Sequence, residues 1–167
     1  MPSRREMIRM SDAEVADFLA GRRTMNLASH GPNGRIHLVA MWYGFLAVDG
    51  VHDPAVGFEA DTLVIETFAK SQKVLNLRRD PSFTALVEAG DQYSKLQGVE
   101  LSGQAEVVED HDTVVESCKA VLSRYEKFDT DADLAFAADM AANKRVCVRM
   151  RVDRVLSWDH SKLDVAY

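Results

Sequence analysis

The sequence has few cysteines and no long apolar run. Its 167 residues include two cysteines, Cys118 and Cys147, which lie far apart and form no Cys-x-x-Cys pair. This excludes a disulfide framework and a zinc ribbon. No stretch approaches the roughly 18 apolar residues of a membrane span, and the basic N-terminus lacks the apolar run of a secretory signal. We therefore expect a cytoplasmic protein that is not inserted in a membrane.

Basic charge is also scarce. Lysine and arginine number 20 against 26 acidic residues, which gives a net charge of −6. A general nucleic-acid binder would need a basic footprint, so we expect no nucleic-acid partner. The five histidines show no i, i+4 pair and no neighbouring cysteine, so we expect no metal site. Neither a Gly-x-Ser-x-Gly elbow nor a Gly-rich dinucleotide fingerprint is present.

What is present suits one globular domain. Hydrophobic residues make up 47% of the chain and charged residues 28%. We expect a single domain over residues 1–167, with residues 1–10 as a flexible tail. Ser11 and Glu14 have the spacing of a capping box, which predicts a helix that ends near Gly21.

The rest of the chain alternates β-branched runs with turn residues. We expect strands over 23–29, 35–48, 62–67, 82–87 and 99–108, and over 145–158 with a break near Asp153. We expect helices over 71–79, from a cap at Asp112 to Tyr125, and over 131–143. A helix does not follow each strand, so a doubly wound sheet is excluded. The pattern favours a mainly β fold, a closed antiparallel barrel of six to seven strands with peripheral helices.

Two segments of this pattern carry more detailed expectations. Strand 35–45 has bulky apolar residues on both faces, which predicts that it is covered on both sides. Residues 49–61 predict an exposed loop that is either a lid or an insertion, and we favour the insertion because loops tolerate added length.

A local inversion of charge marks residues 67–79. Four basic residues and no acidic one lie between Lys70 and Arg79. A helix that begins here would present free N–H groups beside the hydroxyls of Thr67 and Ser71 and the ammonium of Lys73. The segment predicts either a phosphate cradle or a capped surface helix with solvated lysines.

The order of these segments resembles a known family. The matching residues are Ser11–Glu14, Leu27–Ser29, Gly34, Met41–Tyr43, Thr67, Ser71–Lys73, Asn76–Pro81, Gln97–Gly103, Arg124–Tyr125 and Ser157–Leu163. Together they resemble the pyridoxamine 5'-phosphate oxidase-like, FMN-binding split β-barrel family, and especially its actinobacterial branch of deazaflavin (coenzyme F-420)-dependent oxidoreductases.

The resemblance implies a homodimer with a cofactor in each groove between two barrels. Lys73 would be the main phosphate partner. The other cofactor-binding residues that it implies are Thr67, Ser71 and Gln72 at the phosphate, Val39, Met41 and Trp42 along the ring, Gln97 from the neighbouring chain, and Trp158.

The resemblance also implies the activity. We expect an oxidoreductase that moves a hydride between reduced coenzyme F-420 and a small conjugated or heteroaromatic substrate. The alternatives are an FMN enzyme in the same groove and a non-catalytic flavin- or haem-binding module. No catalytic residue stands out, because Tyr43 and Tyr125 can be proton donors or, more often on a barrel strand, packing residues.

Departures from the family pattern narrow the activity. The family's flavin-using oxidases have Arg at the position of Gln72 and an Arg-x-His element where this chain has Asp159-His160. The oxidation of pyridoxamine phosphate, the activity of those enzymes, is therefore disfavoured for this chain. Ala40 stands where the deazaflavin branch often has Pro.

Overall fold

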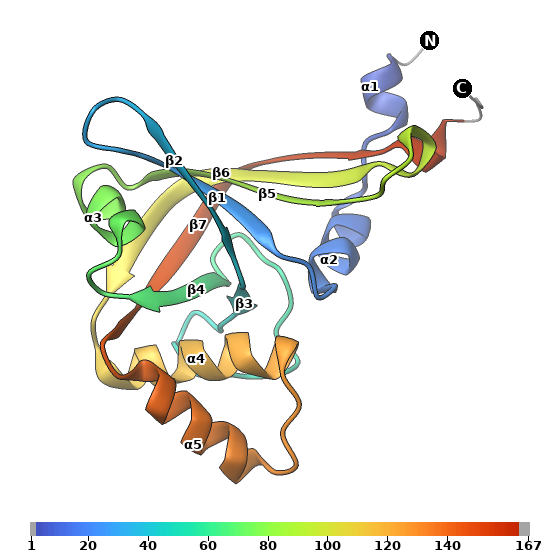
Figure 1. Ribbon diagram of the computed structural model, residues 1–167. Helices are drawn as coiled ribbons and strands as arrows, with labels where there is room; N and C mark the ends of the chain where they lie inside the picture. The colour runs from blue at the N-terminus through green and yellow to red at the C-terminus, as the bar shows by residue number, and fades with distance from the viewer. Residues whose placement is uncertain (1–2, 164–167) are drawn as a thin grey trace.

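The computed structural model describes residues 3–163, in which seven strands form one antiparallel sheet in the order β2-β1-β5-β6-β7-β4-β3. The sheet curls around a core of buried side chains from every strand except β2, and Figure 1 shows β4 and β3 facing β1 and β2 across that core. This confirms the expected split barrel, but the barrel is not closed as expected, because β2 and β3 are the two edges of the sheet and do not pair with each other. The strands are β1 (Met25–His30), β2 (Ile36–Met41), β3 (Gly44–Phe45), β4 (Leu63–Phe68), β5 (Ser82–Ala89), β6 (Gln97–Val108) and β7 (Arg145–Asp159).

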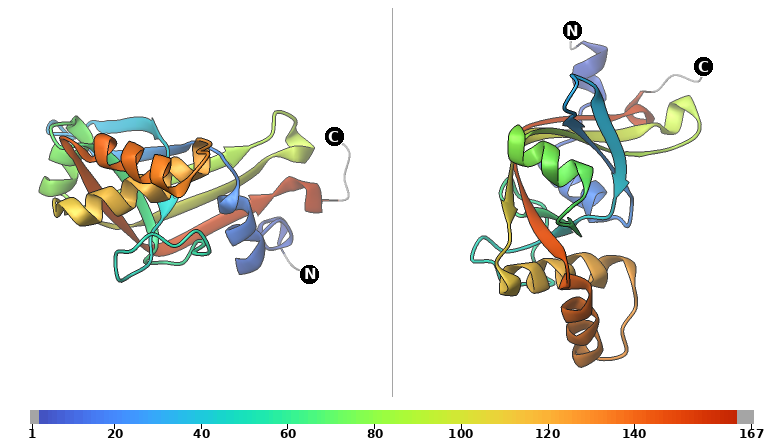
Figure 2. Two further views of the ribbon diagram at one scale, coloured as in Figure 1. Left: turned by 90° about the horizontal axis from the view of Figure 1, so that it is seen from below. Right: turned by 60° about the vertical axis from the view of Figure 1, so that its left-hand side comes forward.

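The helices lie around this sheet. Figure 2 shows α3 across one end of the curl, with α4 and α5 packed below it. A second cluster of buried apolar side chains joins α4 and α5 to the outer face of the barrel. No helix within residues 3–163 has the length and apolar content to cross a membrane. The helices are α1 (Arg4–Met7), α2 (Asp12–Ala20), α3 (Gln72–Arg79), α4 (His111–Tyr125) and α5 (Asp131–Ala142), with short 3-10 turns η1 (Tyr93–Lys95) and η2 (His160–Lys162).

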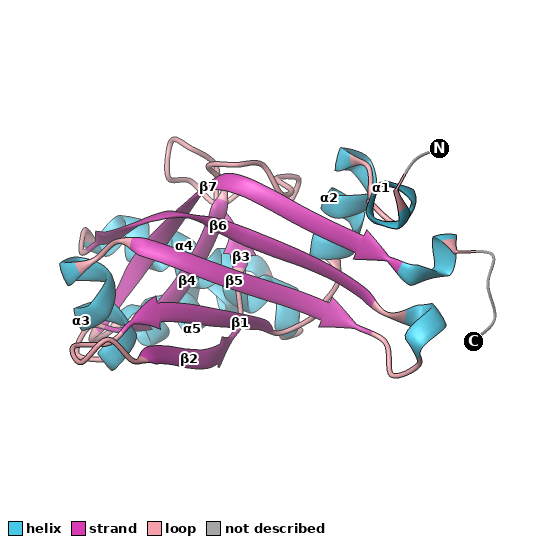
Figure 3. Cartoon of the chain, turned by 90° about the horizontal axis from the view of Figure 1, so that it is seen from above, coloured by secondary structure: helices cyan, strands magenta, loops and turns pink. Residues whose placement is uncertain are grey.

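The long strands β5, β6 and β7 extend beyond the barrel, and Figure 3 shows the far end of β7 beside α1. The predicted break near Asp153 is wrong, because β7 is continuous across it. Ser102 pairs with Arg154 and Gly103 with Val152, so Asp153 is an extra residue that bulges out of the ladder. Gly103 suits this position, since a Cβ there would come within 1.9 Å of the Arg151 carbonyl oxygen.

Three other expectations need correction. Strand β2 is not covered on both faces: Ile36 and Leu38 are 58% and 65% exposed, because β2 is an edge strand of the sheet. The strand does not continue through Val48, since only Gly44–Phe45 pair with β4. The cap of α4 is Asp110 rather than Asp112, because the Asp110 carboxylate accepts from the backbone N–H of Thr113.

The loop over residues 49–61 forms no helix or strand, as expected. It is anchored to the barrel by Val56 and Phe58, which pack against the main core. The Phe58 ring meets the Phe45 ring edge-on at 6.3 Å between centroids. The backbone N–H of His52 also donates to Glu116 on α4. These contacts fit an insertion that packs against the barrel.

Residues 3–10 contact the far end of β7. The N–H of Asp159 donates to the carbonyl of Ile8 at 2.7 Å, and the N–H of Met10 donates to the Ser157 hydroxyl at 3.1 Å. Met10 itself is buried. The segment expected to be a flexible tail therefore has defined contacts over its described residues.

The capping box of α2 also fastens this segment. Glu14 accepts from the N–H of Ser11, as its spacing predicted, and from the ammonium of Lys162 at 2.7 Å. The Lys162 hydrogen bond, with smaller help from Ser11, lowers the pKa of Glu14 to about 2.

We expect Glu14→Gln to lower the free energy of unfolding at neutral pH but not in strong acid. A carboxylate with a lowered folded-state pKa stabilises the fold above its ordinary value of 4.5, and this contribution is lost as the pH falls toward about 2. Thermal unfolding of both proteins across this range would measure it. A gap between the two proteins that stays constant down to pH 2 would contradict the assignment.

Candidate functional site

The junction of β4 and α3 holds a cluster of polar side chains. The Lys73 ammonium donates to the Thr67 hydroxyl at 3.0 Å, and Thr67 is buried at the end of its strand. Burial lowers the pKa of Lys73, while the nearby Glu66 carboxylate opposes this change. Lys73 is therefore held at the barrel end and is not a freely solvated surface lysine, which favours the cradle over the alternative of solvated lysines.

The Ser71 hydroxyl is the unusual member of this cluster. Ser71 caps α3, yet its side chain makes no capping hydrogen bond. Its Oγ is buried and has no partner among the described residues. The N–H groups of Gln72 and Lys73, in the first turn of α3, have no carbonyl four residues earlier within the helix. An anionic oxygen placed here could accept from the hydroxyl, the N–H groups and the ammonium together.

A buried polar chain fixes α3 to β1. Gln72 donates to the Asn76 amide oxygen at 2.8 Å, and Asn76 donates to the Ser29 hydroxyl at 3.1 Å. Asn76 is completely buried, whereas Gln72 is exposed. Asn76 thus holds the helix that carries Lys73 to β1, and Gln72 supports the Asn76 amide from within α3.

We expect Asn76→Ala to lower the free energy of unfolding by about 1–3 kcal/mol, because it leaves the buried Ser29 hydroxyl unpaired. Gln72→Ala is the matched control, since it removes the exposed partner of the same chain and should cost less than about 1 kcal/mol. Urea unfolding of both variants measures the difference. Equal losses would show that the Asn76–Ser29 bond does not fix α3.

The inner face of β2 runs from this helix along the barrel. His37 lies directly opposite Ser29, so its side chain is on the same face as the polar chain. Val39 and Met41 follow on that face and are half-buried against the main core. Val39 and Met41 thus lie further along β2 and face the main core, whereas Thr67, Ser71, Gln72 and Lys73 lie at the junction of β4 and α3.

Trp42 has a different setting. Its ring stacks on Tyr125 of α4, with 4.6 Å between centroids and planes within 1°, and it stays 41% exposed. One face of the indole is thus occupied by Tyr125.

The two candidate tyrosines are packing residues. The Tyr43 hydroxyl donates to the Leu19 carbonyl at 2.8 Å, and the Tyr125 hydroxyl donates to the Arg23 carbonyl at 2.7 Å. Burial raises the pKa of Tyr43 to about 12 and raises that of Tyr125 as well. The Arg124 guanidinium lies over the Tyr43 ring, 4.7 Å from the ring centroid, and adds a cation–π contact to this packing. Neither phenol is poised to give up a proton.

Gln97 and Trp158 lie at the other end of the long strands. Gln97 donates to Asp159 at 2.9 Å, and Trp158 lies against Gly98, where a Cβ would come within 2.2 Å of the indole. Thr67 pairs with Val146, and Trp158 is further along the same strand. At about 3.3 Å per residue this separation is roughly 40 Å. Within one chain the structure does not bring these two residues to the Lys73 cluster.

Sequence reasoning missed three residues near the cradle. Arg145 forms an ion pair with Glu66 and lies over the Phe68 ring at 4.6 Å, so a second cation stands near Lys73. The pairing of β4 with the start of β7 places Arg145 here. No local pattern in the sequence reveals that pairing. The third is His37, whose Nδ1 is buried without a partner among the described residues.

The cysteines and the other titratable groups offer no further chemistry. Burial raises the pKa of Cys118 to about 12 and that of Cys147 to about 11, so both thiols stay protonated. Within residues 3–163 no three His, Cys, Asp or Glu side chains lie close enough to hold a metal ion.

The curled seven-stranded sheet, with a helix placed at the end of β4, defines the split-barrel class. The chain belongs to the pyridoxamine 5'-phosphate oxidase family, whose model matches residues 11–159. A search of curated proteins gave no match.

Solved structures agree on the fold. A conserved hypothetical protein from Mycobacterium tuberculosis is 40% identical with a TM-score of 0.83, and the match covers 99% of this chain and 95% of that one. An F-420 reductase is 20% identical with a TM-score of 0.57, over 83% of this chain and 93% of the other. A haem storage protein from Vibrio cholerae is 12% identical with a TM-score of 0.63, over 91% and 98%. The last two share the fold alone.

Proposed function

We propose that this protein is a deazaflavin (coenzyme F-420)-dependent reductase that acts on a small conjugated or heteroaromatic substrate. The observation that carries the proposal is the buried, unpartnered Ser71 hydroxyl at the start of α3, two residues before Lys73, whose ammonium meets Thr67. These donors fit a phosphate group, which the deazaflavin and FMN both carry. The bound deazaflavin supplies the hydride.

The protein's own residues bind and orient. Lys73, Thr67 and Ser71 hold the phosphate, with Gln72 beside them in the first turn of α3, and Asn76 keeps α3 in place against β1. Val39 and Met41 offer an apolar inner face of β2 for the ring, with Trp42 at its end. Since Tyr43 and Tyr125 donate to backbone carbonyls, we assign the proton that completes the reduction to solvent.

We propose a homodimer for the same site. Gln97 and Trp158 are too distant from Lys73 within one chain, so they join the site only if they come from a second copy. The exposed apolar side chains Ile36 and Leu38 on β2 offer a surface that a second copy would cover. The cofactor groove then lies between the two barrels.

Titration with F-420, FMN and haem tests the proposal. We expect saturable F-420 binding, weaker FMN binding, and oxidation of reduced F-420 when an enone or nitroaromatic acceptor is added. Tighter FMN binding would favour the flavin enzyme. Haem binding with a Soret band and no turnover would favour the storage function that the Vibrio protein's name describes.

A further inference from the structure

A pocket lies at the opposite end of the sheet from α3. It has a volume of about 790 Å³, within the roughly 300–1,000 Å³ of small-molecule sites. One wall is α1 and the segment after it, and the other is the last part of β7 with one residue of β6; we call it the α1–β7 pocket. Its lining residues are Ser3, Arg5, Glu6, Ile8, Arg9, Glu100, Arg154, Val155, Leu156, Ser157 and Trp158.

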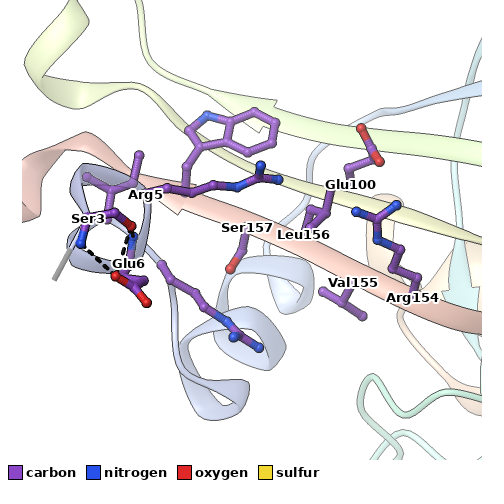
Figure 4. Close-up of a pocket in the computed structure, with 11 residues that line it drawn as sticks. Ser3, Arg5, Glu6, Glu100, Arg154, Val155, Leu156 and Ser157 are labelled. Carbon is purple, nitrogen blue, oxygen red and sulfur yellow. Dashed lines mark hydrogen bonds between the residues drawn. The ribbon is translucent and has the colours of Figure 1, made fainter.

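Cations dominate this pocket although the chain is acidic. Arg5, Arg9 and Arg154 line it against two carboxylates, in a chain whose net charge is −6. Figure 4 shows Arg5 reaching from α1 across β7 and Arg154 rising from β7, with Leu156 between them in this view. Within residues 3–163, none of the three guanidinium groups makes a hydrogen bond or ion pair.

Neither carboxylate forms an ion pair with the arginines among the described residues. Glu6 accepts from the N–H of Ser3 at 2.6 Å and from its hydroxyl at 2.9 Å, which completes the capping box of α1. These bonds lower the pKa of Glu6 and hold it as a carboxylate committed to α1. Glu100 forms no ion pair within the described residues, so the guanidinium groups remain available to a ligand.

The walls of the pocket are fixed in place. Besides the bonds of Ile8 and Met10 to β7, the Lys162 ammonium donates to the Arg9 carbonyl at 2.9 Å. The same ammonium meets Glu14. The backbone that carries Arg5 and Arg9 is thus held along β7.

The remaining lining is apolar. Ile8, Val155 and Leu156 are half-buried, and the Trp158 indole is half-buried against Gly98. Guanidinium groups bind carboxylates and sulfonates through paired N–H donors and stack on flat rings, whereas an indole binds flat apolar bodies. The lining therefore suits one ligand with an anionic group and an aromatic body.

We propose that the α1–β7 pocket binds a small aromatic anion, with Arg5, Arg9 and Arg154 holding the anionic group and Leu156 and Trp158 contacting its flat body. This goes beyond the proposed reductase function, because one chain supplies the whole lining and the pocket lies far from the Lys73 of that same chain. Trp158 is the one residue shared with the proposed cofactor site.

The test uses 8-anilinonaphthalene-1-sulfonate, an aromatic anion that fluoresces when bound, and the neutral N-phenyl-1-naphthylamine, which has the same aromatic body. We expect the full-length protein to bind the sulfonate at one site per chain, at least ten times more tightly than the neutral amine. The double variant R9Q/R154Q should lose at least tenfold in sulfonate affinity. R9K/R154K should be intermediate, because it keeps the charge but not the paired donors.

Two matched variants complete the test. R35Q/R151Q removes the same charge from exposed positions outside the pocket and should bind the sulfonate like the wild type. K73M should weaken F-420 binding ten- to a hundredfold and keep sulfonate binding, so failure of this proposal is distinguishable from failure of the reductase. Equal losses in R9Q/R154Q and R35Q/R151Q, or equal affinity for the two probes, would overturn the pocket.

Discussion

Lys73→Met is expected to weaken F-420 binding ten- to a hundredfold. The substitution removes one charge-assisted contact to phosphate, which contributes about 1.5–3 kcal/mol, and keeps the apolar stem of the side chain. Thr67 loses only its bond from the ammonium, and its hydroxyl remains able to bind phosphate. Fluorescence titration of both proteins with F-420 gives the ratio of dissociation constants.

Lys70→Met is the matched control, since Lys70 lies in the same basic segment but makes no side-chain hydrogen bond to any residue between 3 and 163. It should change F-420 affinity less than threefold. Burial lowers the pKa of Lys73, so this ammonium loses its proton at a lower pH than an exposed lysine does. As the pH is raised, the affinity of the wild type for F-420 should therefore begin to fall earlier than the titration of an exposed lysine predicts. The K73M variant should lack this pH dependence. Equal affinities for K73M and the wild type would remove Lys73 from the site.

Leu38→Glu is expected to separate the proposed dimer and to abolish F-420 binding with it. Leu38 is 65% exposed on the edge strand β2, so a charge there costs the isolated chain little. In a symmetric dimer both chains carry the substitution. Each new carboxylate would be buried at the interface and stripped of its hydrating water, which destabilises the dimer. We expect the dimer dissociation constant to rise by roughly a hundredfold or more. Sedimentation equilibrium at micromolar concentration measures it.

Val51→Glu provides the comparison, because Val51 is also exposed at 56% but belongs to the loop over residues 49–61. This variant should remain dimeric and bind F-420 normally. Two results would refute the shared groove: a wild-type protein that sediments as a monomer, or an L38E monomer that still binds F-420 with unchanged affinity.

Much of the fold was predictable because its signals are local. The Ser11–Glu14 capping box, the turn residues over 30–34 and the stop at Asp80-Pro81 each act within a few residues of chain. The predictions that were wrong concern features that depend on contacts between segments distant in the sequence. Whether β2 is covered depends on its place at the sheet edge, and the continuity of β7 depends on Gly103 of β6 accepting the bulge at Asp153.

The candidate site divides in the same way. The sequence by itself determined the cluster of Thr67, Ser71 and Lys73, because a strand end and a helix start only a few residues apart must place these groups together. Only the tertiary structure brought Arg145 to Glu66, next to this cluster, and separated Trp158 from it along β7. It also placed α1 against β7 and so created the α1–β7 pocket. Pairing between strands that are distant in the sequence sets these distances. The local pattern of residues carries no information about that pairing.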